Sequence, residues 1–525
     1  MTRPAPLGNK DRIAAVTARV DSVPEWVNIA DAFLADRVAD GGGDRIALRL
    51  PHRTLTYTQV ERFAGGYATA LRELGVHRED RVVLLLDDGA DFVGALFGAL
   101  KLAAVVVMVN PELAADRIAE ILDLAQPQAV VHQDRLGDVV TAAVAASSGS
   151  AIPAVLAVPA PGLDVDALVP AAPTHRDDPA LWLFSGGTTG VPKAVVQTHG
   201  SFLNTTLRYA QETLGYTADD ITVAVPKLIF GYATGSNLFF PLSVGASAVL
   251  FPEPTTVESL TAHIARHRPT ILITVPTMMG RMLADPVARD ADLSSIRFAT
   301  SAGEALPVEL YHRWKETYGV ELLDGLGTAE MWHIFVTNRL DDVRPGTLGK
   351  PVAGFEVRVC DDDGNPVPAG DIGRLWVRGG SRAWGYWRDL PRTMETFRGE
   401  WVAGSDLVRY DEDGYLEHHG RADEALKVSG RWLAPQEVES CLLSHEAVAQ
   451  CVVVGVGDAT GLVKPVAFVI AAESRPGLEA ELIDHVLARL EPYKHPRQVV
   501  LVDDFPRTHL GKVDRAALKA SISKL

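Results

Sequence analysis

The chain of 525 residues contains little cysteine and has no excess of positive charge. Its three cysteines, Cys360, Cys441 and Cys451, are too few and too widely spaced for a disulfide framework or a cysteine-rich metal site. The formal net charge is −17, whereas a nucleic-acid-binding protein normally presents a basic patch. We therefore expect no nucleic-acid partner. A few local cations can still bind a small anion, because distant charges are screened at physiological salt.

The sequence also lacks an apolar run long enough to cross a membrane. The longest such stretch, 92–109, is interrupted by Gly94, Gly98 and Lys101, and a bilayer span needs about 20 apolar residues. It is expected to form a core helix followed by a buried strand. The N-terminal segment has no apolar signal core. These features predict a cytoplasmic protein without a membrane span.

Short apolar runs rich in β-branched residues alternate with amphipathic segments through most of the chain. This alternation predicts an α/β architecture with a substantially parallel sheet. The Ala- and Pro-rich segment around 141–176 is expected to form loops and a surface helix. The runs expected to be strands are 81–86, 103–109, 129–132, 246–251 and 270–275.

The residue pattern changes past residue 345, where turn clusters of Asp, Gly, Asn and Pro separate short expected strands at 355–359 and 373–378. A compact tail then begins near 423, with expected strands at 449–456 and 465–470 and a helix near 478–490. We predict an N-terminal domain, 1–422, made of parallel-sheet α/β subdomains and a β-rich subdomain from about 345. A small α+β C-terminal domain, 423–525, follows it.

A loop rich in glycine and threonine, Ser185-Gly-Gly-Thr-Thr-Gly-Val-Pro-Lys193, has the composition of an anion site. Glycines let backbone N–H groups approach phosphate, hydroxyls donate to its oxygens, and a lysine supplies charge. It is not a Walker loop, because the Gly-Lys-Ser/Thr ending is missing. The strand-like segment 181–184 before it favours a phosphate-binding loop over a plain linker.

This loop resembles the ATP loop of the acyl-CoA synthetase, luciferase and nonribosomal adenylation-domain superfamily. Further resemblances follow in the family's order, so that the likeness covers about residues 45 to 515. They are Leu55-Thr-Tyr-Thr, Leu326-Gly-Thr-Ala-Glu330, Gly404-Ser-Asp406, Gly420-Arg-Ala-Asp423 and Pro506-Arg-Thr-His-Leu-Gly-Lys512.

The resemblance implies that a carboxylic acid is activated with ATP and Mg²⁺ as an acyl-adenylate and then transferred to an acceptor. Lys512 would bridge the acid carboxylate and the α-phosphate, on a C-terminal domain that is mobile about a hinge at Asp423. Glu330 and Thr188 would hold Mg²⁺, and Thr188 and Lys193 would take part in catalysis. Nucleotide and coenzyme contacts are implied for Ser185, Gly187, Thr188, Thr189, Gly190, Lys193, Gly303, Glu304, Asp324, Gly325, Leu326, Gly327, Thr328, Glu330, Asp406, Arg421, Lys427, Gly430 and Lys512.

The sequence departs from the family pattern at several uncharged positions. Ala329 stands where a threonine is expected to touch the α-phosphate, and Leu326 where an aromatic residue is usual near adenine. Gly186, Ala194 and the order Gly404-Ser405 also differ. No charged catalytic group is missing.

Several segments resemble benzoate-CoA and hydroxybenzoate-CoA ligases more than fatty-acid or acetate enzymes, among them 226–232, 301–307 and 330–335. That resemblance implies a benzoate-like acid, with Gly231 compatible with a substituted or bicyclic one, and Lys427 near its carboxylate. His418 and His419 are expected to be surface or loop residues rather than a metal site. The acyl pocket would be lined by Phe230, Gly231, Tyr232, Ala302, Gly303, His333, Ile334 and Lys427.

The sequence indicates the acceptor of the acyl group less specifically than it indicates the acid. Coenzyme A is favoured, since the chain carries no carrier domain and 427–430 resembles the pantetheine path of CoA ligases. An enzyme that transfers to an amine or a carrier-protein thiol is one alternative, and a nonenzymatic binding protein with the same fold is another. The expected partners are thus a small carboxylic acid, ATP and CoA, and a homodimer is compatible with the sequence.

Overall fold

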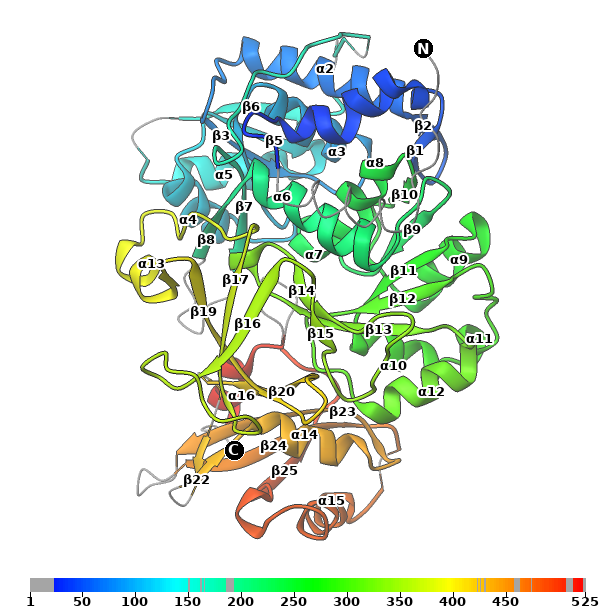
Figure 1. Cartoon of the computed structure of the whole chain (residues 1–525), viewed down its shortest axis with the longest axis vertical. Helices are drawn as coiled ribbons and strands as arrows, with labels where there is room; N and C mark the ends of the chain where they lie inside the picture. Colours follow the sequence, from blue (N-terminus) through cyan, green and yellow to red (C-terminus); the bar gives the residue numbers. More distant parts are fainter. Residues whose placement is uncertain are drawn as a thin grey trace.

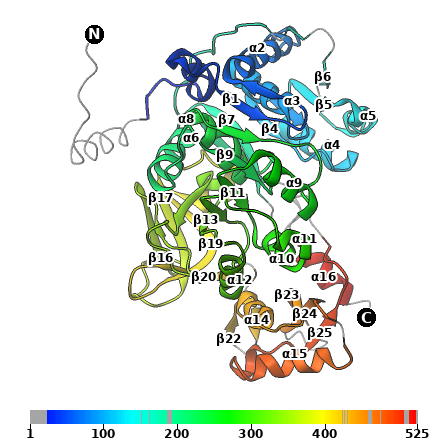
Figure 2. The same ribbon diagram turned by 90° about the vertical axis from the view of Figure 1, so that its right-hand side faces the viewer.

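The computed structural model describes residues 23–149, 152–160, 163–164, 166–185, 193–422, 424, 426–428, 431–457, 463–473, 475–506 and 513–522. These residues form two large sheets covered by helices, a β-rich subdomain and a small C-terminal part. Figures 1 and 2 show that the C-terminal part lies at one end of the long axis, beyond the β-rich subdomain.

The first large sheet has the strand order β6-β5-β3-β4-β7-β8, with every neighbouring pair parallel except β7 and β8. Its central strands are continuous apolar runs because both faces of the sheet are covered. β6 lies inside the segment that we expected to be loop and surface helix, so that expectation was wrong there. The strands are β3 (Arg81–Leu85), β4 (Val105–Met108), β5 (Ala129–Gln133), β6 (Ala154–Val158), β7 (Pro179–Ser185) and β8 (Lys193–Thr198).

The helix α3 (Ala90–Lys101) packs on this sheet, and α2 (Tyr57–Glu73) packs closely against α3. α2 begins at a capping box in which Thr56 and Gln59 each accept a hydrogen bond from the other's backbone N–H. A Cβ at Gly98 would lie only 2.6 Å from Tyr67 Cβ, so glycine permits the close approach of the two helices. The expected helix followed by a strand within 92–109 is therefore confirmed as α3 and β4. Among the described residues, no helix is long and apolar enough to span a bilayer.

The second large sheet has the order β15-β14-β13-β12-β11-β9-β10-β1-β2. The strands from β13 to β1 run parallel, and antiparallel strands flank them at both edges. Ligands of such sheets bind outside the carboxyl ends of the parallel strands. The strands are β1 (Ile46–Arg49), β2 (Thr54–Thr56), β9 (Ile221–Ala224), β10 (Ser247–Val249), β11 (Ile271–Thr274), β12 (Phe298–Ser301), β13 (Leu322–Gly327), β14 (Ile334–Thr337) and β15 (Lys350–Pro351).

The β-rich subdomain is an antiparallel sheet made of β16 (Phe355–Cys360), β17 (Gly373–Gly379), β18 (Phe397–Arg398), β19 (Trp401–Tyr410) and β20 (Leu416–Arg421). The C-terminal part contains the hairpin β21 (Leu426–Val428) and β22 (Arg431–Leu433), together with the sheet β23 (Val448–Gly457), β24 (Val463–Ala471) and β25 (Gln498–Leu501). In the β-rich subdomain, the turn clusters lie between the strands, as predicted.

The remaining helices cover these sheets and fill the connections (Figures 1 and 2). They are α4 (Ala115–Ala125), α5 (Gly137–Ala146), α6 (His199–Thr205), α7 (Gly231–Thr234), α8 (Phe240–Val244), α9 (Val257–His267), α10 (Pro276–Ala284), α11 (Pro286–Arg289), α12 (Val308–Tyr318), α13 (Leu390–Thr396), α14 (Pro435–Leu443), α15 (Leu478–Leu487) and α16 (Arg515–Ile522).

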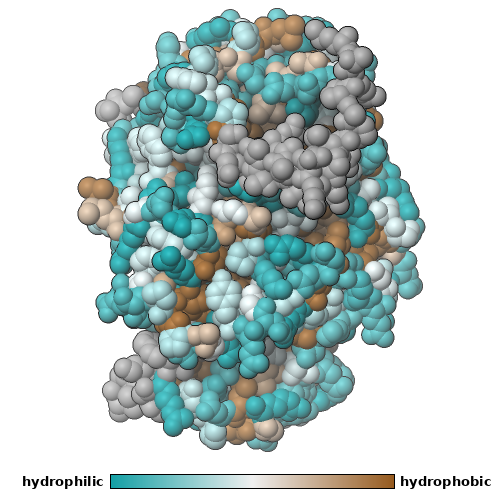
Figure 3. All heavy atoms as spheres, viewed as in Figure 1, coloured by the Kyte–Doolittle hydropathy of each residue, from teal (hydrophilic) through white to brown (hydrophobic). Residues whose placement is uncertain are grey.

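The predicted fold class, α/β with a β-rich subdomain and a small C-terminal domain, is confirmed. The boundary at 422/423 stays a prediction, and Asp423 lies outside the described residues. The face drawn in Figure 3 is mainly hydrophilic. Apolar atoms project at its left-hand edge, at the height where Figure 1 places α13, whose Leu390 and Met394 are both 67% exposed.

Candidate active site

The predicted phosphate loop connects β7 and β8, which are antiparallel neighbours. Ser185 pairs with Lys193 across them, so the two ends of the loop lie side by side. Lys193 is half-buried at the first residue of β8. The side chain of Ser185 lies outside the described residues, as do the loop residues predicted to bind phosphate, Gly187, Thr188, Thr189 and Gly190. The structure thus places the base of the loop, and its anion-binding groups stay a prediction.

Glu330 lies in a short 3-10 turn, Ala329–Met331, just past the end of β13. Its carboxylate accepts a 2.6 Å hydrogen bond from the hydroxyl of Tyr386. Next to it, Gln197 on β8 donates to the backbone oxygen of Ala329, also at 2.6 Å. The strand that leaves the phosphate loop and the carboxylate predicted to bind metal are therefore neighbours.

The sequence reasoning missed Tyr386, which is 56 residues from Glu330 along the chain. Burial, together with the adjacent Glu330 carboxylate, raises the pKa of Tyr386 well above its usual value. The phenol therefore stays protonated and acts as a permanent hydrogen-bond donor to Glu330. Its ring packs against Phe397 of β18, so the β-rich subdomain fixes its position.

Glu330 is the described carboxylate of the site that fits a nucleotide-bound Mg²⁺. Within the described residues, no group of three or more His, Cys, Asp or Glu side chains is arranged to hold a metal ion. A nucleotide-bound Mg²⁺ needs less than that, since it takes one or two carboxylates together with phosphate oxygens and water. Glu330 fits this role, because Tyr386 engages one carboxylate oxygen and a monodentate ligand uses only the other.

Two unpaired polar atoms lie on β13 and just past its end. Asp324 Oδ1 and Thr328 Oγ1 are buried and have no hydrogen-bond partner among the residues that the structure describes. Buried polar groups are nearly always paired in folded proteins. These atoms therefore indicate a place where a ligand supplies the partners, at the strand ends predicted to bind nucleotide through Asp324, Gly325, Leu326, Gly327 and Thr328.

Asp324 is only 9% exposed, and this burial raises the pKa of its carboxyl to about 7. The nearby Ser301 hydroxyl and His418 imidazole act in the opposite direction but do not offset the burial. A carboxyl with a pKa perturbed in this way is a common feature of functional sites.

Gly303 and Glu304 follow β12. Gly303 has a φ of +85°, which glycine adopts without strain. The Glu304 carboxylate accepts hydrogen bonds from the backbone N–H and the hydroxyl of Thr277, at 2.9 and 2.7 Å. This side chain therefore stabilises the first turn of α10, a contact that the sequence reasoning did not foresee.

Asp406 and Arg421, both predicted to contact nucleotide, lie directly opposite each other on β19 and β20. Asp406 is 8% exposed. The Arg421 guanidinium donates to Ser405 Oγ at 2.5 Å, and the N–H of Ala422 donates to the backbone oxygen of Ser405 at 2.7 Å. The hairpin thus brings together the two motifs that the sequence separates by a turn.

His418 is a site residue that the sequence reasoning did not identify. It lies on β20, and its Nε2 is 3.1 Å from Asp406 Oδ1. The expectation of a surface or loop residue was wrong for His418, because its side chain is 18% exposed and faces Asp406, which is predicted to contact the nucleotide. The turn residues at 411–414 indicate a hairpin. A hairpin that closes there places His418 on the strand next to the one that carries Asp406.

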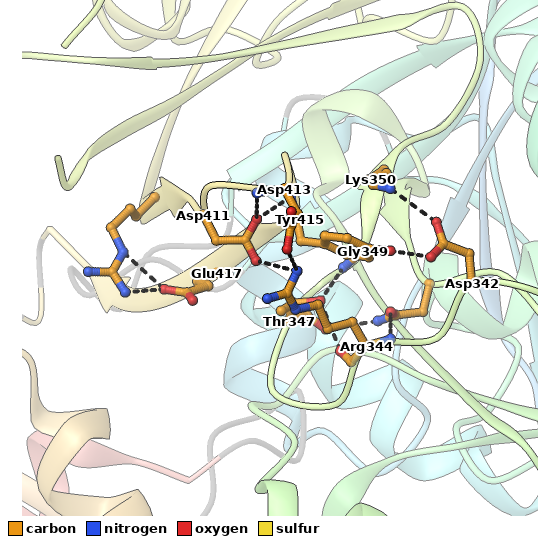
Figure 4. Close-up of polar contacts among 11 residues, drawn as sticks. Asp342, Arg344, Thr347, Gly349, Lys350, Asp411, Asp413, Tyr415 and Glu417 are labelled. Atoms are coloured by element: carbon orange, nitrogen blue, oxygen red, sulfur yellow. Dashed lines mark hydrogen bonds and ion pairs between the residues drawn. The ribbon is translucent and has the colours of Figure 1, made fainter. Parts of the chain in front are cut away.

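A cluster of charges holds the closed end of this hairpin (Figure 4). Arg344 forms ion pairs with Asp411 and Asp413 at 3.2 and 2.6 Å. Asp342 pairs with Lys350 at 3.2 Å and accepts a hydrogen bond from the Tyr415 hydroxyl. The cluster ties the turn between β19 and β20 to the segment around β15, and so fixes the hairpin against the second large sheet.

Three of the residues predicted to line the acyl pocket, Phe230, Gly231 and Tyr232, lie at the start of α7. The Tyr232 hydroxyl lies 2.7 Å from Thr300 Oγ1 on β12. A Cβ at Gly231 would lie 3.0 Å from a methyl carbon of Leu183, so Leu183 fills most of the space that the missing side chain leaves. Phe230 immediately precedes α7. Ala302 is buried at the end of β12.

His333 is buried among aromatic rings. Its Nε2 lies 3.0 Å from the backbone oxygen of Tyr232 and 3.2 Å from Ser236 Oγ. Burial lowers the pKa of His333 to about 3, so the imidazole is neutral at physiological pH. Nδ1 has no hydrogen-bond partner among the described residues. Ile334 follows as the first residue of β14, and it is also buried.

The predicted residues of the C-terminal domain are only partly described. Lys427 belongs to β21 but its side chain lies outside the described residues, as do Gly430, Asp423 and Lys512. The flanks of the lysine motif are fixed, since the Asp514 N–H donates to the backbone oxygen of Pro506 at 2.7 Å. Arg515 then pairs with Glu439 at 2.9 Å and with Glu424 at 3.5 Å. Arg515 thus links the base of that motif to the residue after the predicted hinge.

Comparison with known proteins agrees with this architecture. The model of AMP-binding enzymes matches residues 35–387, and the model of the AMP-binding enzyme C-terminal domain matches residues 437–512. The benzoate–CoA ligase of Thauera aromatica is 38% identical over 519 residues, covering 95% of this chain and 97% of that protein. The 4-hydroxybenzoate–CoA/benzoate–CoA ligase of Rhodopseudomonas palustris is 37% identical over 506 residues, which is 94% of each.

A solved structure gives the same result. The anthranilate CoA ligase AuaEII in complex with anthranoyl-AMP is 35% identical, with a TM-score of 0.91 over 96% of this chain and 100% of that one. The fold and the strand-end site define a nucleotide-dependent enzyme of the adenylate-forming kind. The chain belongs to the family of AMP-binding enzymes, and these three relatives are ligases of aromatic acids.

Proposed function

We propose that this protein is an aryl-CoA ligase, which activates a benzoate-like acid with ATP and transfers the acyl group to coenzyme A. The observation that carries the proposal is the joining of two parts at the ends of β12 and β13. One part is formed by the acidic residues Asp324 and Glu330, which lie on β13 and just past its end. The other is the enclosed aromatic region around Tyr232 and His333.

The first half-reaction joins the acid to AMP. An oxygen of the acid carboxylate attacks the α-phosphorus of ATP, the bond to the β-phosphate oxygen breaks, and pyrophosphate leaves. Lys512 is proposed to lie between the two anions and to offset their repulsion. Asp406 binds the ribose hydroxyls, and the polar atoms of Asp324 and Thr328 face the nucleotide. Alignment is the main contribution, because oriented reactants reach effective molarities of about 10⁵–10⁸ M.

We propose Glu330 and Thr188 as the residues that hold Mg²⁺ with the nucleotide. When bound, the ion neutralises charge on the phosphate oxygens. The protein's own contribution is to orient Glu330, and the neutral Tyr386 hydroxyl does this by donating to one carboxylate oxygen. Lys193, at the base of the phosphate loop, adds positive charge on the same side.

In the second half-reaction the thiol of coenzyme A attacks the acyl carbon and loses its proton, and AMP leaves as the carbon–oxygen bond breaks. We propose that the C-terminal domain turns about Asp423 between the two steps. Lys427 and Gly430 then lie near the acyl and pantetheine groups.

The pocket chemistry supports an aromatic acid. Tyr232, His333 and the neighbouring Phe240 and Trp332 form one group of ring contacts, with centroids 4.7 to 5.7 Å apart for the pairs Phe240–His333, Tyr232–His333 and Phe240–Trp332. Apolar pockets with a few polar groups suit flat aryl rings. Because His333 Nε2 faces a carbonyl oxygen and the ring is neutral, Nε2 carries the hydrogen and Nδ1 is an acceptor. An acid with a hydroxyl or amino substituent could supply the missing donor.

Incubation of the purified protein with ATP, Mg²⁺ and a panel of aryl and alkyl acids tests the proposal. Pyrophosphate release should depend on the acid and be fastest with aryl acids, and mass spectrometry should then find the aryl-CoA thioester. An amide or an acylated carrier protein as the preferred product would favour the alternative acceptors. Absence of acid-dependent pyrophosphate release would favour a binding protein. A cytoplasmic location and a homodimer remain predictions, and light scattering would test the latter.

A further inference from the structure

His418 and Asp406 form a pair in which each side chain is largely withdrawn from water. His418 Nε2 lies 3.1 Å from Asp406 Oδ1, and the side chains are 18% and 12% exposed. An ionised carboxylate can only accept hydrogen bonds. Nε2 must therefore carry the hydrogen and donate it to Asp406, whether or not the imidazole is charged.

The strand geometry makes this contact specific. Asp406 is opposite Arg421, whereas His418 is opposite Val408, and the pairing is irregular between these two positions. His418 therefore reaches Asp406 diagonally, a distance that a long side chain can cover. His419, the next residue, instead lies 3.3 Å from Glu417 on its own strand.

The start of β20 is held in place. The cluster of Figure 4 fixes the turn before it. In addition, Leu416 exchanges backbone hydrogen bonds of 2.7 and 2.8 Å with Leu348 and Gly349. His418, two residues further along, thus lies close to a fixed part of the strand.

The His418 imidazole also lowers the pKa of the buried Asp324 carboxyl, which burial raises. It therefore acts on two carboxyl groups that are predicted to contact the nucleotide.

We propose that His418 is a positioning residue for the ribose subsite. Its Nε2–H fixes the Asp406 carboxylate in the orientation that accepts hydrogen bonds from the ribose hydroxyls. Rotation of the carboxylate about its Cβ–Cγ bond is lost when the nucleotide binds. A donor that fixes the rotation beforehand reduces this cost. The inference relies on Asp406 as the ribose ligand, which is part of the proposed function, but not on the identity of the acid or the acceptor.

The test measures AMP binding by titration calorimetry, so it needs neither the acid nor CoA. His418→Phe keeps a ring but removes the donor, and His418→Gln keeps an N–H donor. His419→Phe is the matched control on the same strand. Loss of a hydrogen bond to a charged group should weaken AMP binding on the order of tenfold in His418→Phe. His418→Gln should recover most of the affinity, and His419→Phe should bind like the wild type.

A second ligand separates positioning from a structural role. With 2′,3′-dideoxy-AMP, which has no hydroxyls for Asp406, His418→Phe and the wild type should bind within about twofold of each other. An equal loss with both nucleotides would overturn the proposal, as would unchanged AMP binding in His418→Phe. If His418→Phe does not fold, His418→Leu takes its place in the same comparison. If the protein does not activate aryl acids, only the pyrophosphate assay would show it. The ratios of nucleotide affinity between the variants and the wild type would be unchanged.

Discussion

Replacing Asp324 by asparagine should stabilise the protein at alkaline pH, although the residue lies in the predicted nucleotide site. Burial raises the pKa of this carboxyl from 3.8 to about 7. The folded state therefore binds the proton more tightly than the unfolded chain. The contribution of Asp324 to the free energy of unfolding is therefore largest below pH 4, falls as the pH rises toward 7, and stays reduced above it. Asparagine does not ionise, so the Asp324→Asn variant does not lose stability in this way as the pH rises.

The size of the effect follows from the two pKa values. The full difference between the pKa of 3.8 in the unfolded chain and about 7 in the folded protein corresponds to about 4 kcal/mol in the free energy of unfolding. Between pH 5 and pH 8, ionisation of Asp324 should lower the free energy of unfolding of the wild type by about 3 kcal/mol. The advantage of Asp324→Asn over the wild type should grow by this amount across the same interval. Because two pH values are compared, the pH-independent effect of the amide cancels.

Urea denaturation followed by tryptophan fluorescence at pH 5 and pH 8 measures this difference. Asp341→Asn, at an exposed position, is the control for loss of one negative charge. A difference between variant and wild type that is the same at both pH values would refute the reasoning. It would mean that the Asp324 carboxyl is hydrated, and that its unpaired oxygen does not mark a dry ligand site.

Two further substitutions separate the roles assigned to the nucleotide site. Lys512→Ala should reduce adenylate formation by at least about 100-fold, while CoA thioester formation from a supplied aryl-adenylate should be largely retained; equal loss of both steps would contradict the role of Lys512. Tyr386→Phe removes the donor to Glu330 and should raise the Mg²⁺ concentration for half-maximal pyrophosphate release by about three- to tenfold. An unchanged Mg²⁺ requirement would show that Tyr386 does not orient Glu330.

The sequence was most informative where apolar periodicity or a charged motif was local. The α3–β4 unit within 92–109 and the strands β16 and β17 appear where the pattern predicted them. β6 was missed because Ala154–Val158 is a short run among alanines and prolines. Its pairing with β5 stabilises it, and this long-range contact leaves no local signal.

The same distinction applies to the site. Glu330 and Asp406 stand in ordered motifs, so their side chains could be named from the sequence. Tyr386 and His418 act through contacts that only the folded chain creates, with Glu330 and Asp406 respectively. Glu304 shows the reverse, since it lies in a predicted nucleotide segment but its carboxylate pairs with Thr277.

The most direct test of the central claim is a measurement of acid-dependent pyrophosphate release by the purified protein, with ATP, Mg²⁺ and matched aryl and alkyl acids. CoA is then added and the product identified by mass. The account predicts the highest kcat/KM for a benzoate-like acid and a product with the mass of its CoA thioester. A higher kcat/KM for a medium-chain alkyl acid than for every aryl acid tested would contradict it.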